Sequence, residues 1–513
     1  MRFMRGKMNG TKKKTAGETA RSYNDRPLSV SLSDNIDHLY AIFNQTPDLV
    51  VRQLTIKKSG SQAALVYLDG LTDKNAINNN VLRPLQNENG ENSPNGLPAV
   101  TIGDAREMNG WAQLEKAILT GCSILLIEGS LAALVMDTHG WPQRAIEDPQ
   151  LEASLKGAHQ GFVETGSQNI ALIRRYLPDR ELKITEHVVG KRGKTTVSLL
   201  YLGDVANLEL LQELSRRIES VDTDSVINTG ELVEFIEDNP YSPFPQFVLT
   251  ERPDAAASQL LQGRFVAVVD RSPSVLIGPA GFSAFFQSVD DYSTRWMVAT
   301  FIRILRFLGF LIAIFLPAMY IAVISFNYEV IPLKLLLSIG ESRERVPFPP
   351  ILEALLMEVT LEMLREAGIR LPTPVGQTVG IVGGIVIGQA AVQAGIVSNI
   401  MVIVVAFTAI ASFIIPNYDM ASAIRLIRFP MMLIASMFGI VGITIGLMTL
   451  IGHIIALETL GTPYGIPFAP VRFSDWKDTF VRLPLWQMVK RPHGAKPQQF
   501  RRQGTNRPKG EDK

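Results

Sequence analysis

The stretch of sequence that decides the fold is Phe307–Tyr328, FLGFLIAIFLPAMYIAVISFNY, which contains no charged residue. An α-helix rises about 1.5 Å per residue, and the hydrocarbon core of a bilayer is about 30 Å thick. The 22 residues of this stretch are therefore enough for one crossing. The sequence predicts a membrane-spanning helix that begins far from the N-terminus.

Further apolar segments follow this helix. Residues 379–415 are 37 uncharged positions, too long for one crossing, and Ser398-Asn399 near the middle indicates a tight turn between two helices. Residues 430–457 form another apolar segment. We therefore expect a membrane domain over residues 293–470, with spans at about 307–328, 379–397, 399–415 and 430–457.

The composition predicts a large soluble part in front of this membrane domain. Hydrophobic residues make up 46% and charged residues 19% of the chain, and the mean hydropathy is +0.15. Between about residues 34 and 292, short apolar runs alternate with amphipathic stretches, which is typical of mixed α/β structure. The predicted fold class is a soluble α/β N-terminal region of two subdomains, 34–156 and 157–292, followed by an α-helical transmembrane bundle. No clean internal repeat is recognisable.

Both ends of the chain are basic. The first fourteen residues contain six Lys or Arg and no acid, and residues 472–513 contain eleven Lys or Arg against four Asp or Glu. We interpret residues 1–33 as a disordered basic tail and residues 471–513 as a basic, flexible cytosolic tail, either solvated or in contact with anionic lipid.

The orientation follows from the N-terminus. No apolar segment follows the basic start, so no cleavable signal is expected and the soluble region should stay in the cytosol. Four crossings then place both ends on that side. Arg303 and Arg306 before the first span agree with this orientation, although the loop after the span is equally basic.

Several function classes are disfavoured. A net charge of +1 provides no field that would attract nucleic acid. Cys122 is the single cysteine and the chain has only six histidines, so no zinc or iron–sulfur framework is expected. The phosphate-binding loop, the zinc-protease motif and the nucleophile elbow are all missing. We expect no enzyme, no cofactor and no metal.

The stretch 350–367 is predicted to be an amphipathic helix that begins with a proline at its first position. Glu358, Glu362 and two further charged residues share a stripe of about 100° at helical spacing, whereas Glu353 lies on the apolar side. One interpretation is a solvated interfacial helix, with Glu353 favoured in the first turn by the helix dipole. The other is an acidic face along an ion path, which makes Glu353, Glu358 and Glu362 pore or gating candidates.

Glycines recur every four residues in two of the expected spans. Gly380, Gly384 and Gly388 form one such stripe, and Gly442 and Gly446 repeat the pattern. Small residues at this spacing let another helix approach closely. The approaching helix is either a neighbouring span of the same chain or a second subunit around an axis.

Three polar or helix-breaking residues lie inside the expected spans. Gln389 and Gln393 are one turn apart, and we expect them to bond to a neighbouring helix or to line a water path as pore candidates. Pro317 removes a backbone donor and leaves a carbonyl unpaired in the first span. It is a hinge candidate, or only a packing bend.

Short motifs add a family resemblance. The membrane half contains the motifs PFPP at 347–350, LREAG at 364–368, IGQAAV at 387–392, RLIRFP at 425–430, GTPY at 461–464 and PFAP at 467–470. The soluble half contains GFVE at 161–164, TERPD at 250–254 and DDY at 290–292. With these motifs, residues 35–485 resemble the A subunit of the GerA family of spore germinant receptors. One departure is Arg271, which stands where glycine is more usual in the family.

The resemblance implies a subunit of a nutrient-sensing complex in the inner membrane of a bacterial endospore. Its implied partners are a permease-like B subunit, which holds the nutrient, and a lipoprotein C subunit. The A subunit is expected to self-associate into a ring and to conduct ions when nutrient binds. Two alternatives stay open: a non-conducting scaffold or signal transducer of the same complex, and a stage V sporulation AF-like paralogue that amplifies germination.

Overall fold

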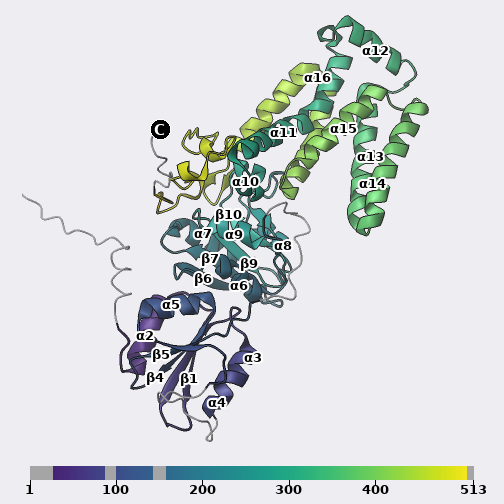
Figure 1. Ribbon diagram of the computed structural model, residues 1–513. Coiled ribbons are helices and arrows are strands. Elements are labelled where there is room, and N and C mark those ends of the chain that lie inside the picture. Colours follow the sequence, from purple (N-terminus) through teal and green to yellow (C-terminus); the bar gives the residue numbers. More distant parts are fainter. Residues whose placement is uncertain (1–26, 87–99, 142–156, 505–513) are drawn as a thin grey trace, which may run out of the picture.

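The computed structural model describes residues 27–86, 100–141 and 157–504 of the chain. Figure 1 shows three parts in succession: a first sheet with its helices, a second sheet with its helices, and an elongated helical bundle. The predicted fold class, two α/β subdomains followed by a helical bundle, is confirmed. Most of the expected N-terminal tail, residues 1–26, lies outside the described residues. The last residues of this expected tail are folded onto the first subdomain: Leu28 is buried, and Pro27 forms a β-bridge with Gly110.

The first subdomain contains an antiparallel five-stranded sheet with the order β1-β2-β4-β5-β3. Its strands are β1 (Leu49–Thr55), β2 (Gln62–Leu68), β3 (Ala105–Met108), β4 (Ser123–Ile127) and β5 (Ala133–Met136). On one face pack α2 (Leu32–Ile42) and α5 (Trp111–Thr120). On the other face pack α3 (Lys74–Ala76), η1 (Ile77–Leu82) and α4 (Arg83–Gln86).

The second subdomain contains another antiparallel sheet, with the order β6-β7-β9-β10-β8. Its strands are β6 (Leu182–Val189), β7 (Thr195–Leu202), β8 (Val248–Thr250), β9 (Phe265–Val269) and β10 (Val275–Gly278). On one face pack α6 (Gly166–Tyr176) and α9 (Pro253–Leu260). On the other pack α7 (Leu208–Glu219) and α8 (Thr229–Ile236).

The two subdomains repeat one topology. Each runs helix, two strands, helices, strand, helix, two strands, and each sheet has its first, second, fourth, fifth and third strands side by side. In both, the first helix and the helix before the fourth strand share a face. No repeat is visible in the sequence, because a buried strand position requires only an apolar residue that fits a pleated surface, not a particular one.

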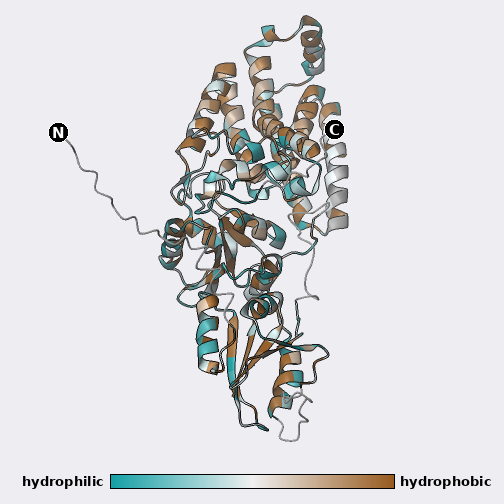
Figure 2. Cartoon of the chain, turned by 60° about the vertical axis from the view of Figure 1, so that its left-hand side comes forward, coloured by the Kyte–Doolittle hydropathy of each residue, from teal (hydrophilic) through white to brown (hydrophobic). Residues whose placement is uncertain are grey.

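The bundle contains six helices within the described residues. They are α11 (Trp296–Ser325), α12 (Leu333–Arg343), α13 (Pro350–Arg370), α14 (Thr373–Gln393), α15 (Asn399–Phe413) and α16 (Tyr418–Ala456). In the described part of the chain, α11 and α16 are long and apolar enough to cross a membrane, and α15 is a shorter apolar helix. Figure 2 shows hydrophobic residues along these helices. Large apolar side chains such as Phe301, Phe407 and Met448 are exposed, which indicates a surface covered by lipid or protein.

The structure differs from the expectation of one crossing over residues 430–457, because the chain reverses inside α16. Gly439 has φ 60° and ψ −139°, which no helix contains. Beyond it, Gly446 lies against the sulfur of Met431, fifteen positions earlier in the sequence. In a straight helix these residues would be about 22 Å apart. Residues on either side of Gly439 therefore form a helical hairpin.

Both ends of this hairpin return to the second subdomain. The His453 ring Nε2 lies 2.8 Å from the Ser242 hydroxyl, and Asp419 lines the same small cavity as Ser242. Gly442 and Gly446 are the small residues at which the two legs of the hairpin approach, Gly442 against Ile434. This glycine pair therefore serves packing inside the chain.

Up to residue 504, the C-terminal segment is folded and is not the flexible tail that the sequence predicts. The chain after α16 forms a small hairpin, β11 (Glu458–Thr459) and β12 (Thr462–Pro463), and then packs between the bundle and the second subdomain (Figure 1). The Arg491 Nε donates to the Leu261 carbonyl at 2.7 Å, and the Gln498 N–H donates to the Val205 carbonyl at 2.8 Å. Basic side chains here satisfy backbone carbonyls, which charge counting alone does not reveal.

The turn between β9 and β10 places position 271 in a backbone conformation that favours glycine. Arg271 has φ 69°, a left-handed conformation that costs a residue with a β-carbon about 1–2 kcal/mol. Its N–H donates to the Glu164 carbonyl at 2.7 Å, which holds the backbone in this geometry. The side chain is exposed, and its guanidinium is 3.8 Å from Asp270, a pair of little value.

We predict that Arg271→Gly raises the free energy of unfolding by about 0.5–1 kcal/mol, because relief of the left-handed strain exceeds the entropy that glycine adds to the unfolded chain. Thermal unfolding of the purified chain in detergent measures the change. Arg192→Gly, in the β6–β7 turn and without a positive φ, is the matched control and should lower stability or leave it unchanged. An Arg271→Gly protein that melts below the parent would contradict the argument.

Candidate functional site in the helical bundle

Helix α13 directs two of its glutamates toward the interior of the bundle. Glu353 is 1% exposed and Glu358 is not exposed at all. The opposite face presents Leu356, Val359 and Met363 to the outside. This arrangement is the reverse of a solvated interfacial helix, and it suits a helix whose outer face meets an apolar environment.

Arg428 of α16 occupies the centre of the bundle and is 2% exposed. One terminal nitrogen of its guanidinium forms an ion pair with Glu358 of α13. The other donates to the Ser412 hydroxyl of α15 at 2.7 Å, and Nε donates to the Ala313 carbonyl of α11 at 2.7 Å. A single side chain therefore joins four helices. We call this group the arginine lock.

Pro317 explains why a carbonyl is available to the lock. In α11 the carbonyl of Ala313 would normally accept from the N–H four residues later, and that residue is Pro317, which has none. The freed carbonyl is buried and needs a donor, which the Arg428 guanidinium supplies. Pro317 is the hinge candidate of the sequence, and the carbonyl that it leaves free is bonded to Arg428 of another helix.

Glu353 belongs to a second ion pair near the other end of α13. One carboxylate oxygen lies 3.0 Å from Nη2 of Arg343, and the other accepts from the Ser398 N–H at 3.0 Å. Ser398 caps α15, because its hydroxyl accepts from the N–H of Met401. Glu353 therefore ties the end of α12 to the turn between α14 and α15, where the sequence predicted a break.

Glu362 lies nearer the soluble part and is partly exposed. Its Oε1 is 3.3 Å from Nε of Arg425, one turn before Arg428 on α16. Arg365 of the same helix lies over the rings of Phe413 and Tyr418, at 5.4 and 5.8 Å from their centroids. All three acidic candidates of α13 are thus paired with arginines inside this chain.

The glycines of α14 divide into two sets. A β-carbon at Gly376 would lie 2.5 Å from the Gly368 carbonyl oxygen, and one at Gly383 would lie 2.7 Å from Leu364, so these two let α14 approach α13. At Gly380 and Gly384 a β-carbon would meet no atom of the described chain within 4 Å. Gly388, the last of the stripe, is buried, and a β-carbon there would lie 3.9 Å from Val402 of α15.

The remaining polar candidates also face outward. Gln389 and Gln393 of α14 are exposed and have no hydrogen-bond partner among the residues that the structure describes. The expectation that they bond to a neighbouring helix is therefore not met within this chain. The sequence also missed Gly309 of α11, where a β-carbon would lie 3.0 Å from the Ala411 carbonyl of α15.

Buried ion pairs also join the second subdomain to α11. Oδ2 of Asp291, in α10 (Asp290–Ser293), lies 2.9 Å from Nε of Arg303 and 2.8 Å from Nη1 of Arg306. Arg303 also bonds to Oδ1 of Asp478 at 2.8 Å, and the Tyr292 hydroxyl donates to Oδ2 of Asp478 at 2.8 Å. The two arginines are neutralised at this junction, so they are poor indicators of membrane orientation.

Acidic residues gather where the hairpin of α16 meets the second subdomain. Burial raises the pKa of Glu237 to about 7, and the negative charges of Glu234 and Asp419 add to the rise. Glu237 therefore binds a proton at a higher pH than an ordinary glutamate does. Proton binding at this contact neutralises one of several like charges.

Arg428 was missed as a site residue because the sequence places it before an apolar segment, in what looked like a loop. The usable signal was the pair of features together: a proline inside one apolar helix frees a carbonyl, and an arginine at the edge of another can supply the donor. The Asp291 and Asp478 contacts join residues far apart in the sequence, and no local pattern predicts them.

Fold and site define a class of protein: two repeated α/β subdomains joined by buried ion pairs to a helical bundle with long apolar helices and an apolar outer surface. A family model described as "Bacillus/Clostridium GerA spore germination protein" matches residues 37–494. The chain belongs to the GerA family, which confirms the resemblance of the sequence motifs.

Two individual proteins and one solved structure are similar to this chain. Spore germination protein GerLA of Bacillus cereus is 41% identical over 450 residues, which are 87% of this chain and 92% of that protein. "Uncharacterized membrane protein YfkQ" of Bacillus subtilis (strain 168) is 39% identical over 472 residues, 91% of this chain and 92% of that protein. A crystal structure of the N-terminal domain of the A subunit of the Bacillus megaterium spore germinant receptor GerK3 is 27% identical, with a TM-score of 0.40, and covers 50% of this chain and 98% of that one.

We predict that Arg428→Met lowers the stability of the bundle by about 3–5 kcal/mol, because it leaves the Glu358 charge and the Ala313 carbonyl buried without a donor. The double variant Arg428→Met/Glu358→Gln should recover part of the loss, since its buried carboxylate is gone. Thermal unfolding in detergent measures both.

The matched control for this experiment is Arg370→Met on the exposed end of α13. Arg370 pairs with Glu366, but the two side chains are 76% and 60% exposed. Its removal should change stability by less than about 0.5 kcal/mol. Equal losses of stability in Arg428→Met and Arg370→Met would show that the arginine lock stabilises the bundle no more than an exposed ion pair does.

Proposed function

We propose that this chain is the A subunit of a nutrient germinant receptor in the spore inner membrane, with its soluble region and C-terminus on the cytosolic side. It acts with a permease-like B subunit, which holds the nutrient, and a lipoprotein C subunit. Copies of the chain assemble into a ring, and the ring conducts ions when nutrient binds. We assign the spans expected at 379–397 and 399–415 to α14 and α15 as part of this proposal.

The open face of α14 carries this proposal. Gly380 and Gly384 leave the backbone bare on a side where no atom of the described chain approaches, while Gly376 and Gly383 already serve the contact with α13. In a bilayer, helices with small residues four apart associate by close backbone packing. A second copy of the chain is the partner that this face would meet in a ring, and the exposed amides of Gln389 and Gln393 would then line or seal the same contact.

The polar contacts suggest how a signal would reach the bundle. A shift of the second subdomain acts on α11 through Asp291, Arg303 and Arg306. The arginine lock connects α11 to α13, α15 and α16. Opening would separate Glu358 or Glu353 from its arginine and expose a carboxylate to passing cations, with Pro317 as the point where α11 bends.

A second candidate is a non-conducting scaffold or signal transducer of the same complex. The observation that favours it is the neutralisation of Glu353 and Glu358 by Arg343 and Arg428 inside the chain. In that case the buried pairs only hold the bundle together. A stage V sporulation AF-like paralogue would share the architecture and differ in its partners.

We expect Gly384→Leu to abolish assembly of the complex and nutrient-triggered germination, because the leucine would occupy the space of the approaching helix. Gly452→Leu is the matched control: this glycine is also helical and exposed, and a β-carbon there would likewise meet no neighbouring atom within 4 Å. Cross-linking in membranes reports assembly, and loss of refractility on nutrient addition reports germination. A normal response of Gly384→Leu spores would remove the support for the ring.

Ion flux separates the channel from the scaffold. In vesicles that contain this chain with its two partners, nutrient should release cations, and Glu353→Gln should change the basal leak because Arg343 loses its counter-charge. Glu366→Gln, on the exposed part of the same helix, should leave the leak unchanged. Absence of flux under every nutrient that triggers germination would favour the scaffold.

A further inference from the structure

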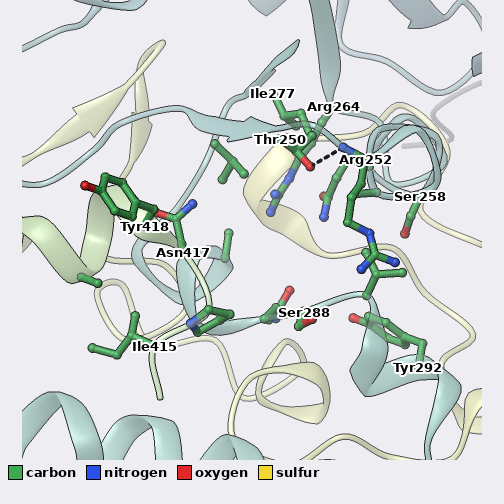
Figure 3. Close-up of a pocket in the computed structure, with 18 of the residues that line it drawn as sticks. Thr250, Arg252, Ser258, Arg264, Ile277, Ser288, Tyr292, Ile415, Asn417 and Tyr418 are labelled. Atoms are coloured by element: carbon green, nitrogen blue, oxygen red, sulfur yellow. Dashed lines mark hydrogen bonds between the residues drawn. The ribbon is translucent and has the colours of Figure 1, made fainter. Parts of the chain in front are cut away.

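A cavity of about 340 Å³ lies between the second subdomain and the near end of the bundle. Figure 3 shows residues from the two parts around it: Thr250, Arg252 and Arg264 from the subdomain, and Ile415, Asn417 and Tyr418 from the bundle. The bundle residues come directly after α15, where the apolar helix ends. On the proposed placement of the spans, the cavity is at the depth of lipid headgroups.

The charge of the cavity is one-sided. Its lining includes three arginines, Arg252, Arg264 and Arg365, and no aspartate or glutamate. Arg252 is compensated by Asp254, whose two oxygens accept at 3.1 and 2.7 Å. Arg365 lies over two aromatic rings. The lining is therefore suited to an anion.

Arg264 is the residue that calls for a ligand. It is 8% exposed, and its Nε and Nη1 atoms are buried without a hydrogen-bond partner. Within the part of the chain that the structure describes, no carboxylate lies within 4.0 Å of its guanidinium. Asp478 is near enough to act on it, but Arg303 and Tyr292 already bind that carboxylate.

Arg264 is charged as well as buried, so its missing hydrogen-bond partners carry a high energetic cost. Burial lowers the pKa of Arg264 to about 10, so the group still carries its charge at neutral pH. A buried charge without a counter-charge is strongly unfavourable. A neutral residue of the same lining also lacks a hydrogen-bond partner: the Oε1 atom of Gln259 is a buried acceptor without a donor.

We propose that this cavity binds a phosphate group, held by the Arg264 guanidinium and facing Arg252. The hydroxyls of Ser258 and Ser288 on the lining can donate to further phosphate oxygens. A hydroxyl on the ligand, either the P–O–H of free phosphate or the alcohol of a glycerol headgroup, would satisfy Gln259. The phosphate comes from an anionic lipid or from the aqueous phase, and the site joins subdomain and bundle through it.

Thermal unfolding of the full chain in a neutral detergent tests the site. Inorganic phosphate is titrated at constant ionic strength against chloride, and mixed micelles with phosphatidylglycerol are compared with micelles containing monooleoylglycerol. Saturable stabilisation by phosphate assigns a free anion, and stabilisation by phosphatidylglycerol alone assigns a lipid headgroup. Absence of both overturns the proposal and means that water satisfies Arg264.

The variant Arg264→Gln should raise the midpoint concentration for the stabilising ligand at least about tenfold, because a charge-assisted bond is lost. Arg192→Gln, an exposed arginine of the same subdomain, is the control and should keep the parent midpoint. An unchanged midpoint in Arg264→Gln overturns the site. If Arg264→Gln does not fold, Arg264→Lys takes its place: it keeps the charge with a different donor geometry, and its midpoint must rise for the proposal to stand.

Discussion

The burial of Arg428 is the constraint on which the bundle depends. A guanidinium is always charged and carries five N–H donors, so its removal from water is tolerated only where acceptors meet it from several sides. Glu358, Ser412 and the Ala313 carbonyl do so from three helices, while Arg428 itself belongs to a fourth. Apolar side chains could pack the same helices in many registers. The polar group selects one register, because a helix that slides by a turn leaves a charge or a carbonyl unmatched.

The same principle operates at the junction with the soluble part. Asp291 meets two arginines of α11, and Asp478 is bound by Arg303 and Tyr292. The Asp291 pairs are buried and the Asp478 side chain is partly exposed; together they connect the second subdomain, α11 and the C-terminal segment. The first subdomain is attached in a similar way: Arg174 of α6 pairs with Asp48, and the Tyr201 hydroxyl donates to Gln45 at 2.7 Å. Charge pairs thus connect all three parts of the described chain.

Much of the fold could be predicted from sequence. Long uncharged segments predicted the helical bundle, and the alternation of apolar and amphipathic stretches predicted the two α/β subdomains. Motifs such as RLIRFP indicated the family. The rest depends on contacts over long sequence distances. The chain reversal at Gly439 is hidden because glycines are common in membrane helices and hydropathy does not change there. The inward direction of Glu358 could not be predicted, because an acid on a helical stripe faces water or an arginine according to the neighbouring helix. Likewise, nothing in the sequence alone marks Arg271 as unusual. Its positive φ shows why glycine would suit this position.

The fold-back of α16 determines how force travels through the molecule. Because the chain before Tyr418 and the chain after Ala456 both meet the second subdomain, a displacement of that subdomain pushes or pulls both legs together. A straight helix held at one end would be free to pivot, whereas the two legs of this hairpin are both held by the second subdomain. Its tip, Gly439, rests against Phe326 and Asn327 after α11. The hairpin therefore connects the soluble side directly to the opposite end of the bundle.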